Sequence, residues 1–120
     1  MKTILQRSLI ASVLVALATT VPAATVSWVG SNGDWNAPAN WNTGALPGPD
    51  DDVVIDLPGN LTITHSSGTH GVLSIQCQES FVLSGGSLSV SNATQFNASF
   101  SLSGGTLSGG GDVTITGTMN

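Results

Sequence analysis

Apolar and polar residues alternate in short runs between residues 59 and 115. Each run has the same order: glycine, any residue, an aliphatic residue, Ser or Thr, and a second aliphatic residue. Alternation of this kind predicts short β-strands with one apolar side, and the glycines predict the turns between them. The runs are 59–63, 71–75, 86–90 and 111–115, with a fifth, 105–109, that lacks its last aliphatic residue.

A longer copy of the pattern indicates how these strands are arranged. Residues 80–89 and 99–108 are identical at eight of ten positions, at an offset of 19. A unit this short cannot bury its apolar side alone and must stack on its neighbours, which predicts a β-solenoid. The alternative all-β fold, a small sandwich, does not require the near-identical copy. Stacking at this offset places Phe100 on Phe81, Leu102 on Leu83 and Leu107 on Leu88, and we expect all four leucines to point inward.

The start of the chain has the pattern of a secretory signal peptide. Lys2 and Arg7 make it basic, and residues 9–18 form an uncharged apolar run that is too short to span a membrane. Small residues precede a cleavage position after Ala23. We therefore expect residues 1–23 to be a signal peptide and the protein to be exported, either secreted or held at the cell surface. An uncut anchor helix is the alternative.

The rest of the chain divides into two regions. We expect residues 24–58 to form an N-terminal cap and the first strands, and residues 59–120 to form an incomplete set of solenoid coils. Residues 30–50 contain four glycines and three prolines, a density that no helix tolerates. No stretch has a helical apolar period, so we expect no helix longer than one turn.

Charge and cysteine content narrow the range of partners. The only basic side chains besides the histidines are Lys2 and Arg7, so the exported part carries acids without Lys or Arg. Such a surface repels phosphate, and we expect neither a nucleic-acid partner nor stable membrane insertion after signal cleavage. Cys77 is the only cysteine, which excludes an internal disulfide. It lies in phase with Ile75, which favours a small buried side chain over a reactive thiol.

The region around the tryptophans resembles the N-terminal segment of large bacterial autotransporter-like surface proteins. The residues that carry the resemblance are W-x-G-x-x-G-x-W-x-x-x-x-N-W-x-x-G-x-x-P-x-x-D from Trp28 to Asp50, followed by DVVI at 52–55. Residues 102–113 resemble the passenger-associated strand repeats of the same proteins. The resemblance implies a right-handed parallel β-helix, an adhesive role in many members and no catalytic residues in this segment. The chain has only a few coils, and we expect it to be the N-terminal part of a longer passenger.

Three tryptophans are the candidate carbohydrate-binding residues: Trp28, Trp35 and Trp41. Flat aromatic faces suit sugar rings. The alternative, which we favour, is a hydrophobic plug over the first coil, because an open solenoid end exposes a sheet edge.

Acidic residues and histidines are the candidate metal ligands. Asp50, Asp51 and Asp52 could bind Ca²⁺, although alternation sends Asp51 to the side opposite its neighbours and favours a solvated turn. We expect no other cofactor. His65 and His70 are interpreted as polar residues of a loop, because zinc requires more ligands than two histidines.

These observations favour an exported structural or adhesive β-helix module over an enzyme. A hydrolase needs two carboxylates across a groove, and only residues 50–56 could supply them. The alternatives are a small carbohydrate-binding module that uses the tryptophans, or the remnant of a polysaccharide-active β-helix enzyme. The expected partners are cell-surface or polysaccharide ligands. We also expect self-association through an open edge at the C-terminal end, after the strand at 113–115.

Overall fold

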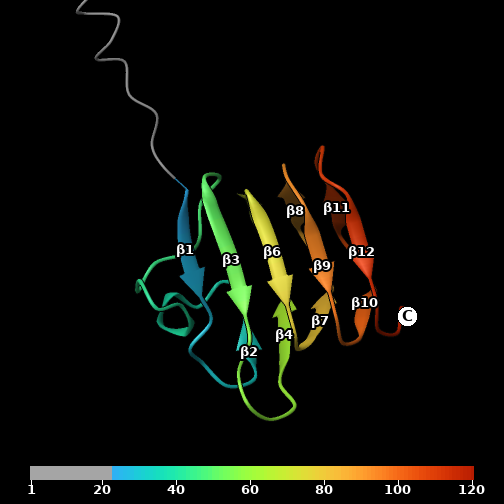
Figure 1. The fold of residues 1–120 in the computed structure, drawn as a ribbon, viewed down its shortest axis with the longest axis horizontal. Helices are drawn as coiled ribbons and strands as arrows, with labels where there is room; N and C mark the ends of the chain where they lie inside the picture. The colour runs from blue at the N-terminus through green and yellow to red at the C-terminus, as the bar shows by residue number, and fades with distance from the viewer. Residues whose placement is uncertain (1–22) are drawn as a thin grey trace, which may run out of the picture.

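Short parallel strands stacked along one axis make up the part of the chain that the structure describes, residues 23–120 (Figure 1). In this computed structural model the strands build three parallel sheets, and each coil passes from one sheet to the next. The predicted all-β solenoid is therefore confirmed, with about three turns. The predicted signal peptide, residues 1–23, lies outside the described residues except for its last position.

The three sheets form the sides of the solenoid. The first contains, in spatial order, β1 (Ala24–Ser27), β3 (Asp51–Ile55), β6 (Ser74–Cys77), β9 (Thr94–Phe96) and β12 (Val113–Ile115). The second contains β2 (Gly33–Asp34), β4 (Thr62–His65), β7 (Ser80–Leu83) and β10 (Phe100–Leu102), and the third contains β5 (Thr69–Val72), β8 (Ser87–Val90) and β11 (Thr106–Ser108). Within residues 23–120 the only helix is a three-residue 3₁₀ turn, η1 (Pro38–Asn40), as expected.

The register of strand pairing stacks equivalent side chains of successive coils on one another. Phe100 pairs with Phe81, at the predicted offset. The same pairing places Leu102 on Leu83, and the third sheet places Leu107 on Leu88. The columns that the repeat predicts are therefore confirmed.

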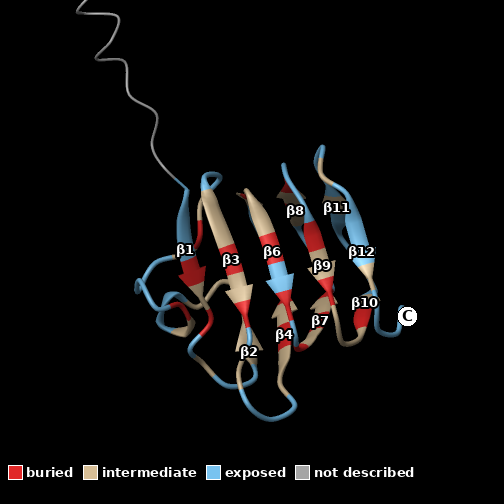
Figure 2. Ribbon diagram, viewed as in Figure 1, coloured by how far each residue is buried: buried red, intermediate tan, exposed pale blue. Residues whose placement is uncertain are grey.

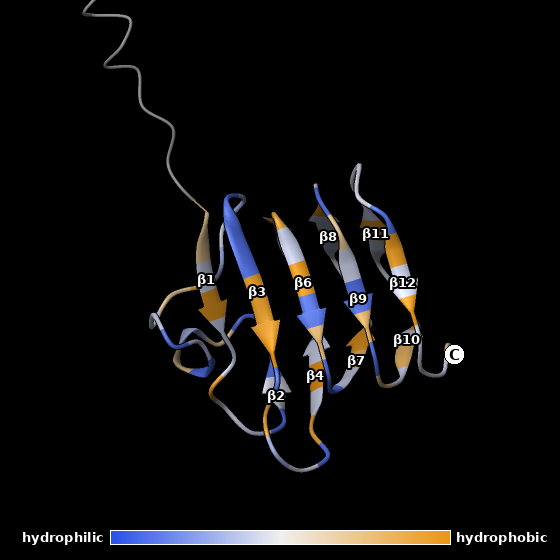
Figure 3. Ribbon diagram, in the orientation of Figure 1, coloured by the Kyte–Doolittle hydropathy of each residue, from blue (hydrophilic) through white to orange (hydrophobic). Residues whose placement is uncertain are grey.

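Alternation along each strand directs every second side chain into one apolar core that runs along the axis. Figure 2 shows buried and more exposed positions alternating along the inner strands, and Figure 3 shows apolar residues at many of the buried positions. Burying one such side chain is worth about 1.5–3 kcal/mol relative to leaving it exposed. The core consists of Val26, Trp28, Trp35, Trp41, Val53, Ile55, Ile63, Val72, Ile75, Cys77, Phe81, Leu83, Leu88, Val90, Phe96 and Phe100.

Glycines allow the coils to approach closely where the chain turns from the second sheet to the third. Gly68, Gly86 and Gly105 occupy equivalent positions in three successive turns, and each has a positive φ. A Cβ atom on Gly86 would lie 2.2 Å from the carbonyl oxygen of Gly68, and one on Gly105 would lie 2.7 Å from that of Gly86. The Ser-Gly-Gly of the repeat is thus a requirement of both backbone conformation and coil stacking.

Alanine variants at Gly86 and at Gly44 should separate the requirement of backbone conformation from that of coil stacking. Both have positive φ, but a Cβ atom on Gly44 would meet nothing within 4 Å. We expect Gly44→Ala to cost about 1–2 kcal/mol of unfolding free energy from backbone strain alone. Gly86→Ala adds the clash with the preceding coil and should cost about 2–5 kcal/mol. Urea denaturation of both variants measures the difference, and equal losses would contradict the stacking argument.

Candidate functional site

The tryptophan cluster is built by a loop that folds back on the first strand. Trp28 follows β1 and continues its pairing with β3 through a hydrogen bond from its backbone N–H to the carbonyl of Val54, at 3.0 Å. Trp28 and Trp41 then form an antiparallel bridge, and the N–H of Asn42 donates to the carbonyl of Ser27 at 2.8 Å. The loop therefore covers the outer edge of β1, which would otherwise be an open sheet edge.

The three indole rings pack edge to face. The ring centroids of Trp28 and Trp41 are 5.0 Å apart, and those of Trp35 and Trp41 are 4.9 Å apart. This is the favoured geometry for aromatic pairs. The indole N–H of Trp28 donates to the carbonyl of Ser31 and that of Trp41 to the carbonyl of Trp35, both at 3.0 Å. The indole N–H of Trp35 is buried without a partner.

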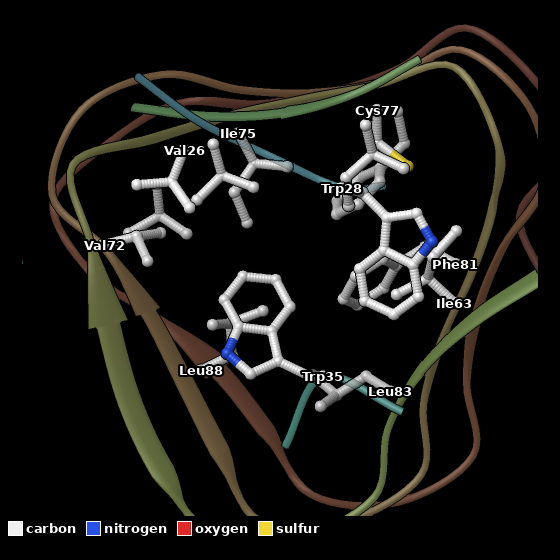
Figure 4. Close-up of a cluster of buried hydrophobic side chains, with 14 of the residues drawn as sticks. Val26, Trp28, Trp35, Ile63, Val72, Ile75, Cys77, Phe81, Leu83 and Leu88 are labelled. Atoms are coloured by element: carbon white, nitrogen blue, oxygen red, sulfur yellow. The ribbon is translucent and has the colours of Figure 1, made fainter. Parts of the chain in front are cut away.

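These rings are not available to a sugar. All three side chains are buried, and Figure 4 shows the chain encircling Trp28 and Trp35 together with the aliphatic core. A carbohydrate platform needs an exposed ring face, which none of Trp28, Trp35 and Trp41 presents in this structure. Their burial agrees with the favoured interpretation, a hydrophobic plug over the first coil.

The acidic turn at residues 50–52 does not converge on a common point. Asp50 is exposed. The carboxylate of Asp51 accepts from the backbone N–H of Gly48 at 2.7 Å, whereas that of Asp52 accepts from the hydroxyl of Ser74. The side chains of Asp51 and Asp52 alternate along β3, as the sequence indicates. Within residues 23–120 no group of three or more His, Cys, Asp and Glu side chains is arranged to hold a metal ion.

The interpretation of the histidines as loop residues is wrong, because they meet inside the first coil. His65 ends β4 and is fully buried, and His70 lies on β5. The Nε2 atom of His65 lies 2.9 Å from Nδ1 of His70, and Nδ1 of His65 lies 3.0 Å from the carbonyl oxygen of Gly85. Register places His65 below Leu83 and His70 below Leu88, so both histidines occupy core columns. The spacing of the two histidines in the sequence did not indicate this contact. Their alignment with the leucine columns of the repeat was the signal that could have indicated it.

Asp34 provides negative charge beside this pair. Its carboxylate accepts from the hydroxyl of Ser66 and from the backbone and side-chain N–H groups of Asn36. Burial raises the pKa of Asp34, but these hydrogen bonds lower it more, so its pKa lies below the ordinary value. Burial lowers the pKa of His70 and the neighbouring His65 lowers it further, while Asp34 raises it; the pKa of His70 lies below its ordinary value of 6.5.

Two further side chains serve the framework of the coils. Cys77 is buried, and burial raises the pKa of its thiol to about 12, which agrees with a small core residue and disfavours a thiolate. Glu79 was not singled out in the sequence. It is buried, and its two carboxylate oxygens accept from the backbone N–H groups of Leu57 at 3.1 Å and Leu61 at 3.2 Å. Glu79 thereby holds the loop between β3 and β4.

The last coil presents inward-directed residues that little covers. Leu102 is 42% exposed and Val113 is 46% exposed, and Figure 2 shows β12 mostly in the colour of exposed residues. Residues 118–120 pair with β10, through the backbone N–H of Phe100 to the carbonyl of Thr118 at 2.8 Å. The expected open edge is therefore covered along β10, whereas β11 and β12 are the outermost strands of their sheets.

The described residues offer few other features from which an activity could be inferred. Residues 23–120 contain no pocket, and none of their helices has the length and apolar character required to cross a membrane. Comparison of the chain with protein-family models, with curated proteins and with solved structures finds no match.

Leu102 pairs with the buried Leu83, as the prediction that the four leucines point inward requires, but it is exposed at the end of its column, and this difference generates a test. Leu83 and Leu102 occupy one column. Leu83 is fully buried because the next coil covers it, whereas Leu102 lies at the end of the column and is exposed. We expect Leu83→Asp to cost at least about 4 kcal/mol, because it buries an unpaired charge. Leu102→Asp should cost about 1 kcal/mol, because its carboxylate reaches water. Melting temperatures of the two variants provide the measurement, and a large loss for Leu102→Asp would mean that this end is covered.

Proposed function

We propose that this protein is an exported structural or adhesive β-solenoid module and forms the N-terminal part of a longer surface or secreted passenger. The observation that carries the proposal is the difference between the two ends of the solenoid. One end is closed by a plug of three buried tryptophans, and the other leaves several core columns partly uncovered. The resemblance of residues 28–55 to the N-terminal segment of autotransporter-like proteins supports the same assignment.

The plugged end fits the beginning of a solenoid. Capping units are needed wherever a stack of coils stops, because the last coil has no neighbour on one side. Here the loop covers β1, and the backbone N–H of Val29 donates to the carbonyl of Asn40 at 2.7 Å within the loop. The loop thus occupies the outer edge of β1, where a preceding coil would pair.

The opposite end fits a coil that continues. Leu102, Leu107 and Ile115 lie in columns of the core but are only partly buried or exposed. A further coil in the same register would cover them and pair with the edges of β11 and β12. Covering about 40 Å² of apolar surface is worth about 1 kcal/mol, so several such side chains would add appreciably to stability.

The lateral faces suit adhesion. Register aligns outward polar side chains into rows that run along the solenoid, such as Gln76, Gln95 and Thr114 on the first sheet. On the second sheet the hydroxyl of Ser99 donates to that of Ser80 at 3.0 Å. Rows of uncharged donors and acceptors match the repeating hydroxyl groups of a polysaccharide, which is the class of ligand that we propose for these faces.

Self-association of residues 24–120 made alone tests whether the last coil accepts a partner. This polypeptide carries seven acids and no Lys or Arg, and salt screens the resulting repulsion. We expect it to sediment mainly as a monomer at low salt and as larger species at high salt. Val113→Asp should abolish the association, because it places a charge on the end of the column. The matched control, Thr114→Asp, adds the same charge on the lateral face and should leave association intact. A monomer at both salts, or equal effects of the two variants, would contradict the prediction.

Binding to polysaccharide distinguishes an adhesive module from an enzyme. We expect fluorescently labelled protein to be retained on beads of at least one neutral polysaccharide without release of reducing ends or unsaturated products. Trp35→Ala is an unsuitable control, since removing a buried indole from the plug costs about 3–5 kcal/mol of stability. Gln95→Glu is preferable, because it changes a half-buried residue in the middle of an outward row. Release of reducing ends would contradict the proposed function.

A further inference from the structure

The contact between His65 and His70 restricts how many protons the first coil can hold. Among the described residues, the only partner of Nδ1 of His65 is the carbonyl oxygen of Gly85, at 3.0 Å. A carbonyl oxygen accepts but cannot donate, so Nδ1 of His65 must carry a hydrogen. In the neutral ring, Nε2 is then a bare acceptor, and the hydrogen of the 2.9 Å contact comes from Nδ1 of His70.

This arrangement leaves one position for an additional proton. Both rings are neutral when Nε2 of His70 is bare, and His70 is only half-buried, so water reaches the ring. One added proton produces a cation that the two rings can share through their hydrogen bond. A second added proton would require hydrogens on both facing nitrogens, which is incompatible with a separation of 2.9 Å. The folded pair therefore holds at most one added proton, whereas two free histidines hold two.

The neighbouring elements place one charged group, two aliphatic side chains and one indole beside the histidine pair. From β2 comes Asp34, whose charge favours the protonated form of His70. From β7 and β8 come Leu83 and Leu88, which are uncharged. The indole of Trp35 packs against both rings, with centroid distances of 5.8 Å to His65 and 6.4 Å to His70. The pair thus lies directly against the tryptophan plug.

We propose that His65 and His70 form a proton-binding site that accepts a single proton in the folded first coil, and that acidification therefore loosens the N-terminal plug. An unfolded chain binds two protons at these positions as the pH falls below about 6.5, so it binds more protons than the folded chain. Stability from the pair is then fully present above about pH 6.5 and decreases as the pH falls below this value. The lowered pKa of His70 acts in the same direction.

The chain provides a natural pattern for the control variant. The two later coils carry leucine in the columns of both histidines. The double variant His65→Leu/His70→Leu removes both polar groups at once, so neither is left buried without a partner. Asp34 and all other acids are retained, and any remaining effect of pH in this variant belongs to them.

Denaturation at several pH values measures the effect, with tryptophan fluorescence as the readout because all three tryptophans lie in the plug. Between pH 6 and pH 5 we expect the unfolding equilibrium constant of the protein to increase about tenfold more than that of the double leucine variant. Equal pH dependence of the two proteins would overturn the proposal.

The proton positions can also be observed without any substitution. The chain contains only two histidines, so ¹⁵N spectra of histidine-labelled protein contain only two imidazole spin systems. We expect Nδ1 to carry the hydrogen in both rings at neutral pH, and only one added proton to enter while the fold persists. If the leucine variant does not fold, His70→Asn provides a second comparison, because its amide can donate to His65 but does not titrate. Two imidazolium rings in the folded protein, or a bare Nδ1 on His65, would overturn the proposal.

Discussion

The stacking of one coil on the next is the interaction on which the rest of this structure depends. No strand in residues 23–120 is longer than five residues, and an isolated pair of such strands is at best marginally stable in water. Parallel pairing of each coil with the next satisfies the backbone groups and covers the inward side chains in the same step. The stability of each coil is therefore set by its neighbours more than by its own composition. The glycines at the corner, such as Gly86 beneath Gly105, follow from the same constraint, since they permit the coils to approach.

The first and last coils of a stack each lack a neighbouring coil on one side, and the two ends of this solenoid are covered differently. At the N-terminal end the loop after β1 supplies three buried indole rings, each larger than any aliphatic side chain of the core. At the other end the short segment 118–120 pairs with β10, but the column of Leu83 still finishes on a partly exposed Leu102. The asymmetry gives the solenoid a direction, and the proposed role as the first part of a longer stack is based on it.

Polar groups in the core occur in successive coils, as His65, Glu79 and Thr94. His65 and His70 are bonded to each other, and Glu79 accepts from two backbone N–H groups, so these buried groups have partners. The hydroxyl of Thr94 and the indole N–H of Trp35 have none, and an unpaired buried group costs about 1–3 kcal/mol. The first coil holds both the tryptophan plug and the contact between the two histidines, and the proposed response to pH is placed there for this reason.

Alternation and the offset of 19 residues were sufficient to predict the solenoid and the columns of Phe81 and Leu88, because both properties are local and repeat along the chain. Alternation determines the side of a strand on which a residue lies, but not which element lies next to it. Whether Trp35 forms a plug or a platform, whether Leu102 is covered, and whether His65 meets His70 depend on the neighbouring coil. Those features were decided only by the tertiary structure, because burial and pairing are properties of the stack and not of a single strand.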